Sequence, residues 1–299
     1  MDTKKFLEKF SLTDFPAGFG GCKNNGQSYE SCEYDITIFD NKANDNSIIE
    51  FEGEIVKIHH GSLTETNPDI LIQYHNMQII LDEQWELRMF LSKINEKKEE
   101  IFRDYVKSCL IDALFCVSKT KDGLKNSDPF ASSWLKCGAY YLADAISGFN
   151  LKRPSPAHML NNIRAYEKNR INKTFSTIND CIGIERATPV LLLRMCKSSI
   201  GFSDMVEANG HSKIIQKKHD YLVKNSLLAD CYFYLAYINR NNLIKVKNIL
   251  NQKPEFIHVL KVAFDLENDP SKIEQQAVLL QKTANELLAL QNPLWLPDI

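Results

Sequence analysis

Two acidic residues, Glu33 and Asp35, stand at the start of an apolar segment and follow a glycine pair, Gly20 and Gly21. Alternate side chains of a β-strand point to one face, so Glu33, Asp35 and Thr37 are predicted to share a strand face. Neighbouring carboxylates suit a hard cation such as Mg²⁺, which takes oxygen ligands and leaves its other positions to water and phosphate. The spacing therefore predicts that Glu33 and Asp35 hold magnesium.

The same residues also fit a simpler interpretation. Acidic residues that alternate with apolar ones are typical of any strand with one solvated face. A glycine pair is in the first place a turn. The strand pattern alone therefore leaves open whether Glu33 and Asp35 do chemistry or only face water.

Phe19-Gly20-Gly21 followed by Glu33-Tyr34-Asp35 resembles the motif of the nucleotidyltransferase superfamily, which includes polymerase β and the small-molecule nucleotidyltransferases. The family motif is a hydrophobic residue, Gly, then Gly or Ser, a spacer, and Asp-hydrophobic-Asp or Glu entering a strand. The resemblance implies Mg²⁺-dependent transfer of a nucleoside monophosphate from a nucleoside triphosphate to a hydroxyl acceptor that the sequence does not name. It also implies that Glu33 and Asp35 bind the metal and that Gly20 and Gly21 lie beside the phosphates.

The family takes a third carboxylate from a neighbouring strand, where it helps to activate the acceptor hydroxyl. Asp69 is the first candidate because it begins an apolar segment, residues 69–72, that is predicted to be a strand. Glu54 and Asp82 remain alternatives. Arg153 adjoins a proline-rich turn after a small-residue, tyrosine-rich helix, which resembles the family's helical domain, and we expect it to bind phosphate.

Two departures from the family motif favour a different function. Glu33 stands where the family has Asp, and the alternative register Asp35-Ile36-Thr37 places a threonine where the second metal ligand belongs. These departures favour a catalytically degenerate module that binds a nucleotide or a protein partner. RNA recognition through basic helices is a third hypothesis, but the net charge of −2 argues against a nucleic-acid partner.

Length and composition indicate an ordinary globular chain. Its 299 residues are 44% hydrophobic and 25% charged, enough for two modest domains. Strand-like segments come first, and helical periodicity begins at Glu83. We therefore expect an α+β fold in which a mixed-sheet, nucleotidyltransferase-like domain (residues 1–120) precedes an all-α helical bundle (residues 121–299). The boundary is placed at the polar segment 119–127, which contains Gly123.

Charge is distributed unevenly along the chain. Residues 1–82 contain six Lys or Arg and fourteen Asp or Glu, a net charge of −8, which leaves +6 for residues 83–299. Lysines gather at Lys213, Lys217 and Lys218. Acidic strands and basic helices could face each other across a triphosphate-binding cleft, or they could be separate solvated surfaces.

No targeting or membrane segment is evident in the sequence. The first residues lack an apolar core, and no apolar window reaches the roughly 20 residues that span a bilayer. The eight cysteines include no C-x-x-C pair. We expect a soluble, cytoplasmic protein with reduced cysteines, of undetermined oligomeric state, while Cys22 and Cys32 remain open as a redox pair.

Overall fold

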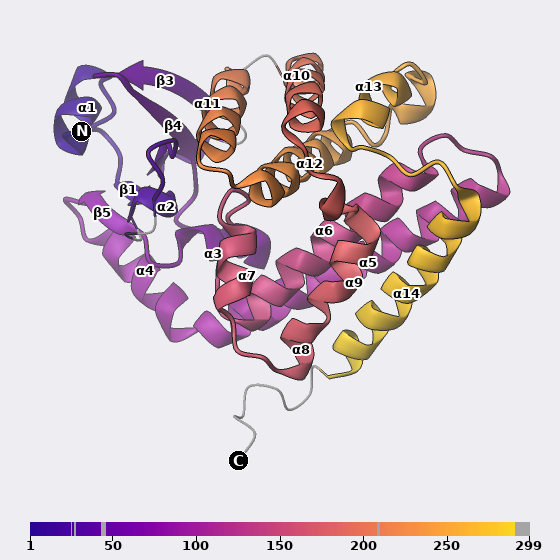
Figure 1. Cartoon of the computed structure of the whole chain (residues 1–299). Coiled ribbons are helices and arrows are strands. Elements are labelled where there is room, and N and C mark those ends of the chain that lie inside the picture. The colour runs from indigo at the N-terminus through magenta and orange to yellow at the C-terminus, as the bar shows by residue number, and fades with distance from the viewer. Residues whose placement is uncertain (25, 27, 43–45, 208–209, 291–299) are drawn as a thin grey trace. The chain divides into compact units, whose positions relative to one another are not determined.

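The computed structural model (Figure 1) describes residues 1–24, 26, 28–42, 46–207 and 210–290. The chain divides into two compact units: Met1–Phe102 with Asn209–Lys218, and Arg103–Ala208 with His219–Ile299. The expected boundary at residue 120 therefore falls inside the second unit. The first unit also takes a segment from much later in the chain, which the order of sequence patterns did not indicate. Residues 291–299 of the expected helical domain lie outside the described residues.

The first unit is built on a five-stranded sheet with the strand order β3-β4-β2-β1-β5. The strands are β1 (Ala17–Gly20), β2 (Tyr34–Ile38), β3 (Ser47–Phe51), β4 (Glu54–His60) and β5 (Gln78–Leu81). Strand β2 pairs antiparallel with β1 and parallel with β4, so the sheet is mixed. Helices supply the regular structure of the described part of the second unit. The predicted α+β class is confirmed.

Helix α1 (Thr3–Lys9) packs against the sheet of the first unit. The same unit contains α2 (Gly21–Asn24), α3 (Pro68–Tyr74) and α4 (Glu86–Glu96). Phe6 and Leu7 of α1 join a buried core with Ile36 and Ile38 of β2. Successive residues of a strand face opposite sides of the sheet. Because Ile36 and Ile38 are buried on one side, Asp35 and the other odd-numbered residues of β2 lie on the opposite face.

Residues 69–72 form part of helix α3, so the prediction of a strand there is wrong. The side chain of Asn67 caps the helix by accepting a hydrogen bond from the Asp69 backbone N–H at 3.0 Å. Pro68 occupies the first turn, where its missing N–H has no cost. This start signal outweighed a short apolar run that fits either a strand or a helix.

Helix α5 (Lys98–Lys125) continues through most of the polar segment that was predicted to be a break. A Cβ atom on Gly123 would lie 3.0 Å from the Cβ of Ala131, which begins α6 (Ala131–Phe149). Gly123 therefore allows two helices of the second unit to approach closely, and it does not end a helix.

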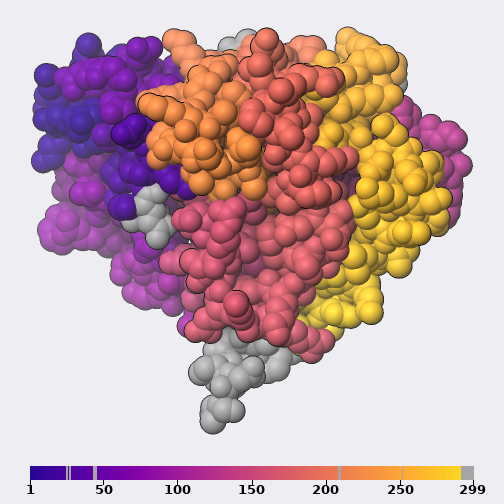
Figure 2. Space-filling model, viewed as in Figure 1, coloured from indigo at the N-terminus to yellow at the C-terminus, as the bar shows by residue number. Residues whose placement is uncertain are grey.

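The other helices complete the chain. They are α7 (Met159–Ala165), α8 (Arg170–Lys173), α9 (Phe175–Ile182), α10 (Pro189–Val206), α11 (His211–Lys224), α12 (Leu228–Lys245), α13 (Phe256–Ala263) and α14 (Pro270–Ala289). Helices α6 and α12 are the most buried, whereas α14, yellow in Figure 2, has a solvent-exposed side. No helix in the described ranges has the length and apolar character required to cross a membrane.

A buried lysine joins three helices of the second unit. Lys136 of α6 is 1% exposed. Its ammonium donates hydrogen bonds to the carbonyl oxygens of Ile182 at 2.9 Å, Asp265 at 2.8 Å, and Phe264. These carbonyls lie at the C-terminal ends of α9 and α13, where a cation is favoured. Burial lowers the pKa of Lys136 to about 7.

A buried ion pair joins α6 to α12. Arg240 Nη2 lies 2.8 Å from Asp144 Oδ2, and both side chains are buried. The hydroxyl of Tyr237 donates to the same carboxylate, with distances of 2.8 and 2.9 Å to its two oxygens. A carboxylate with this many partners fixes how the two helices pack.

Candidate functional site

The glycine pair ends β1 directly beside the acidic strand. Gly20 is the antiparallel partner of Asp35 in the sheet. Gly21 has a φ of 75°, in the left-handed region that favours glycine. A Cβ atom on Gly21 would lie 2.0 Å from Asp35 Oδ2, so the carboxylate occupies the space that a side chain would need. Gly20, Gly21 and Asp35, three of the residues predicted for the site, therefore lie side by side.

The two glycines are buried. Asp35 covers Gly21, so phosphate oxygens do not have an open approach to this part of the backbone in this arrangement. The predicted position of Gly20 and Gly21 beside the phosphates stays a prediction.

Asp35 faces a histidine from the neighbouring parallel strand. His59 Nε2 lies 3.3 Å from Asp35 Oδ1. The parallel pairing of β2 with β4 places His59 opposite Thr37, on the face that carries Asp35. His59 was not among the residues predicted for the site, because the sequence did not reveal that β4 would lie beside β2.

Glu33 forms an ion pair with a lysine from the far end of the chain. Lys218 Nζ lies 2.8 Å from Glu33 Oε1 and 2.7 Å from Oε2. The two side chains are only 9% and 13% exposed, so water and salt screen their attraction weakly. Lys218 belongs to the part of α11 that is counted in the first unit.

The same part of α11 contacts the strand acids at two more points. Lys217 Nζ lies 3.8 Å from Glu54, and Lys213 Nζ lies 3.6 Å from Glu50. Both of these pairs are more exposed than the pair made by Glu33. The acidic strands and the basic helix suggested by the charge distribution do meet within the first unit, where each lysine pairs with a carboxylate.

The candidates for a third carboxylate have other positions and partners. Asp69 is exposed in the first turn of α3, where a negative charge is favoured by the helix dipole. Glu54 also pairs with Lys23, at 2.9 Å. Asp82 caps α4 by accepting hydrogen bonds from the backbone N–H groups of Leu87 and Arg88, at 3.2 and 2.8 Å.

The predicted metal ligands Glu33, Asp35 and Asp69 do not belong to a cluster of three ligands in the described residues. Within the described ranges, no group of three or more Asp, Glu, His or Cys side chains that includes Glu33, Asp35 or Asp69 has its ligand atoms within 4.8 Å of one another. Mg²⁺ is usually held by one or two carboxylates together with water and phosphate oxygens. In this structure a lysine pairs with Glu33 and a histidine lies against Asp35, and the binding of Mg²⁺ by these carboxylates stays a prediction. Arg153 belongs to the second unit, and its role in phosphate binding stays a prediction.

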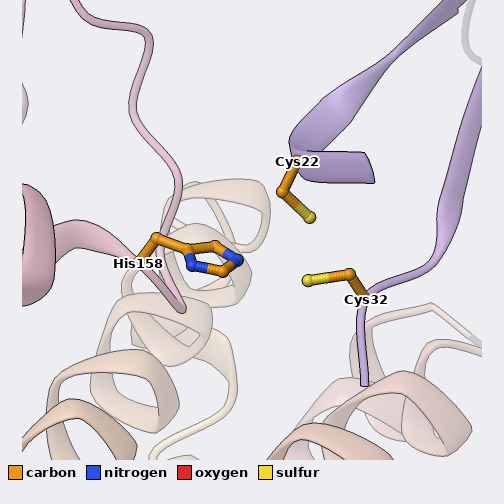
Figure 3. A group of neighbouring side chains, drawn as sticks. All are labelled: Cys22, Cys32 and His158. Carbon is orange, nitrogen blue, oxygen red and sulfur yellow. The ribbon is translucent and has the colours of Figure 1, made fainter. Parts of the chain in front are cut away.

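Two cysteines of the first unit border the same residues. Cys22 follows Gly21 in α2, and Cys32 precedes Glu33. Their sulfur atoms lie within 4.8 Å of each other, and Figure 3 shows the two side chains pointing toward one another. Neither of them forms a disulfide in this structure. His158, also drawn in Figure 3, belongs to the second unit.

The environment of Cys32 favours its thiolate. A hydrogen bond with Cys22 is the largest influence and lowers the pKa of Cys32; burial opposes it, and the charge of Lys218 lowers the pKa further. The loop that connects the two cysteines contains Asn25 and Gln27, which lie outside the described residues.

No family model matches the chain, and no curated protein matches it. The resemblance to nucleotidyltransferases depends on the residues of the first unit described above.

Proposed function

We propose that the first unit is a catalytically degenerate module of nucleotidyltransferase type, which binds a nucleoside triphosphate through side-chain cations and without Mg²⁺. One observation carries this proposal: the carboxylates of Glu33, directly before β2, and of Asp35, within β2, are paired with cationic or protonatable side chains. Lys218 lies 2.7 Å from Glu33, and His59 lies 3.3 Å from Asp35.

The pairing of Glu33 changes which ligands the site favours. A divalent cation would have to displace Lys218 from a largely buried carboxylate, and a buried charge left without its partner is costly. A polyphosphate is instead attracted to ammonium groups and accepts hydrogen bonds from imidazole N–H groups. Lys218 and Lys23 supply ammonium groups in the first unit, and His59 supplies an imidazole.

The sheet supports the nucleotidyltransferase part of the proposal. Gly20 and Asp35 lie on adjacent antiparallel strands, and the Asp35 carboxylate contacts Gly21, so residues from both halves of the sequence motif lie together. The strand on the other side of β2 runs parallel to it and supplies His59. The family takes an additional carboxylate from a neighbouring strand. In this chain the strand next to Asp35 carries a histidine.

A second candidate is the Mg²⁺-dependent transfer of a nucleoside monophosphate to a hydroxyl acceptor. It is favoured by the close approach of Asp35 to Gly21, since the family motif requires these two elements together. It predicts that nucleotide binding requires the metal, whereas the first candidate predicts that the metal is dispensable.

Matched lysine substitutions test the proposal. Lys218→Met removes the cation beside Glu33, whereas Lys213→Met removes the same charge from the same helix at a pair that is 68% and 63% exposed. We expect isothermal titration with ATP, GTP, CTP and UTP to show binding that Lys218→Met weakens at least about tenfold, or roughly 1.4 kcal/mol. Lys213→Met should leave the affinity within about twofold of the native value. Equal affinities of the two variants would contradict the proposal.

A further inference from the structure

We propose that Cys22 and Cys32 form a redox-active dithiol, which becomes an intramolecular disulfide by exchange with a low-molecular-weight disulfide. The two sulfur atoms lie within 4.8 Å of each other, and the side chains point toward one another (Figure 3). The pair is distinct from the cation and carboxylate contacts that support nucleotide binding.

Accessibility separates the roles of the two thiols. Cys22 is partly exposed, whereas Cys32 is fully buried. A dissolved disulfide therefore reaches Cys22 first. The thiolate-favouring surroundings of Cys32 then suit it to the second step, because the thiolate is the nucleophile in thiol–disulfide exchange.

The other cysteines of the chain differ from Cys22 and Cys32 in the surroundings of their thiols. All of them are buried and belong to the second unit: Cys109, Cys116, Cys137, Cys181, Cys196 and Cys231. Burial raises the pKa of Cys137, Cys181 and Cys196 to about 12. Such thiols are poor nucleophiles at neutral pH, so the reaction is expected at Cys22 and Cys32.

The Cys22–Cys32 disulfide forms in two steps of thiol–disulfide exchange. The Cys22 thiolate attacks one sulfur of the small disulfide, forms a Cys22 mixed disulfide and releases one small thiolate. The Cys32 thiolate then attacks the sulfur of Cys22, forms the Cys22–Cys32 bond and releases the second small thiolate. The two protein thiols are oxidised, the small disulfide is reduced to two thiols, and the two protons are taken up by the released thiolates.

The disulfide would connect the glycine turn to the start of the acidic strand. Cys22 follows Gly21, and Cys32 precedes Glu33. Oxidation would therefore fix the distance between the backbone segments that position these two site residues. The dithiol itself does not depend on whether a nucleotide binds, so a failure of nucleotide binding would leave this inference standing.

The sequence makes the test direct. Trypsin cleaves after Lys9, Lys23 and Lys42, so Cys22 and Cys32 fall on separate peptides, 10–23 and 24–42, with one cysteine each. The full chain is reduced, equilibrated with oxidised glutathione, blocked with N-ethylmaleimide and digested without reductant. We expect mass spectrometry to show the two peptides joined, with two hydrogen atoms fewer than the separate peptides, and separated again by dithiothreitol.

Serine variants test the order of the steps. Cys32→Ser should retain one glutathione on Cys22, because the resolving thiolate is missing. Cys22→Ser should leave Cys32 to react with N-ethylmaleimide after unfolding, because its sulfur is buried in the folded chain. Peptides 10–23 and 24–42 that both carry N-ethylmaleimide in the oxidised native protein would overturn the proposal. That measurement needs no variant, so it holds even if a serine variant fails to fold.

Discussion

Gly21→Ala tests the most specific contact of the site, the approach of Asp35 to the glycine turn. The substitution would place a Cβ atom 2.0 Å from Asp35 Oδ2, at a residue whose φ is 75°. Left-handed backbone costs a residue with a Cβ roughly 1–2 kcal/mol. Forcing the carboxylate aside adds an overpacking cost of about 1–3 kcal/mol. We expect Gly21→Ala to destabilise the first unit by about 2–5 kcal/mol in all.

Gly53→Ala is the matched control. Gly53 lies between β3 and β4 with a φ of 77°, and a Cβ atom there would meet nothing within 4 Å. Replacing Gly53 with Ala should therefore cost only the free energy of placing a residue with a Cβ atom in left-handed backbone, roughly 1–2 kcal/mol. The difference between the two variants isolates the contact with Asp35.

The assay follows the first unit by itself. Urea dependence of hydrogen exchange, measured by mass spectrometry on peptides covering β1 and β2, gives the free energy of opening of these strands. In an Asp35→Ala background, Gly21→Ala should lose most of its excess cost, since the closest clashing atoms are gone. Equal destabilisation by Gly21→Ala and Gly53→Ala would refute the contact.

Two further predictions concern the second unit. Asp144→Ala leaves the buried Arg240 without its carboxylate, and we expect thermal denaturation to show a loss of about 3–5 kcal/mol; a loss below about 1 kcal/mol, the value of a surface pair, would contradict this. Lys136 has a pKa of about 7 in the folded chain, below the value of about 10.4 in an unfolded chain. Between these values the unfolded state binds more protons, so the free energy of unfolding of the native protein should rise with pH relative to Lys136→Met, and a constant difference would contradict the assignment.

Local patterns predicted much of the first unit. The alternation around Asp35 predicted strand β2, and the strand-like segments before Glu83 predicted a sheet in the first part of the chain. Each of these signals lies within a few residues and follows from side-chain alternation or turn geometry. The strand predicted for residues 69–72 is wrong because a run of three apolar residues, 70–72, fits a strand or a helix equally well, and the capping signal at Asn67 favours the helix.

The partners of the site residues could not be predicted in the same way. Lys218 reaches Glu33 from 185 positions away, and His59 reaches Asp35 through a parallel pairing of strands. Tertiary packing determines both contacts, so the local spacing of residue types in the sequence does not predict either of them. The sequence therefore predicted the strand that carries Asp35 but not the side chains that pair with Asp35 and Glu33.

Metal dependence of nucleotide binding tests the central claim most directly. The affinities of ATP, GTP, CTP and UTP are measured by isothermal titration with Mg²⁺ and with a chelator, for the native protein and for Glu33→Ala/Asp35→Ala. The account predicts binding that changes less than about threefold with Mg²⁺, or roughly 0.7 kcal/mol, and that survives the double substitution. Binding that requires Mg²⁺ and disappears in the double variant would contradict the account and favour the transferase. Absence of binding under both conditions would also contradict it and leave a protein-interaction module.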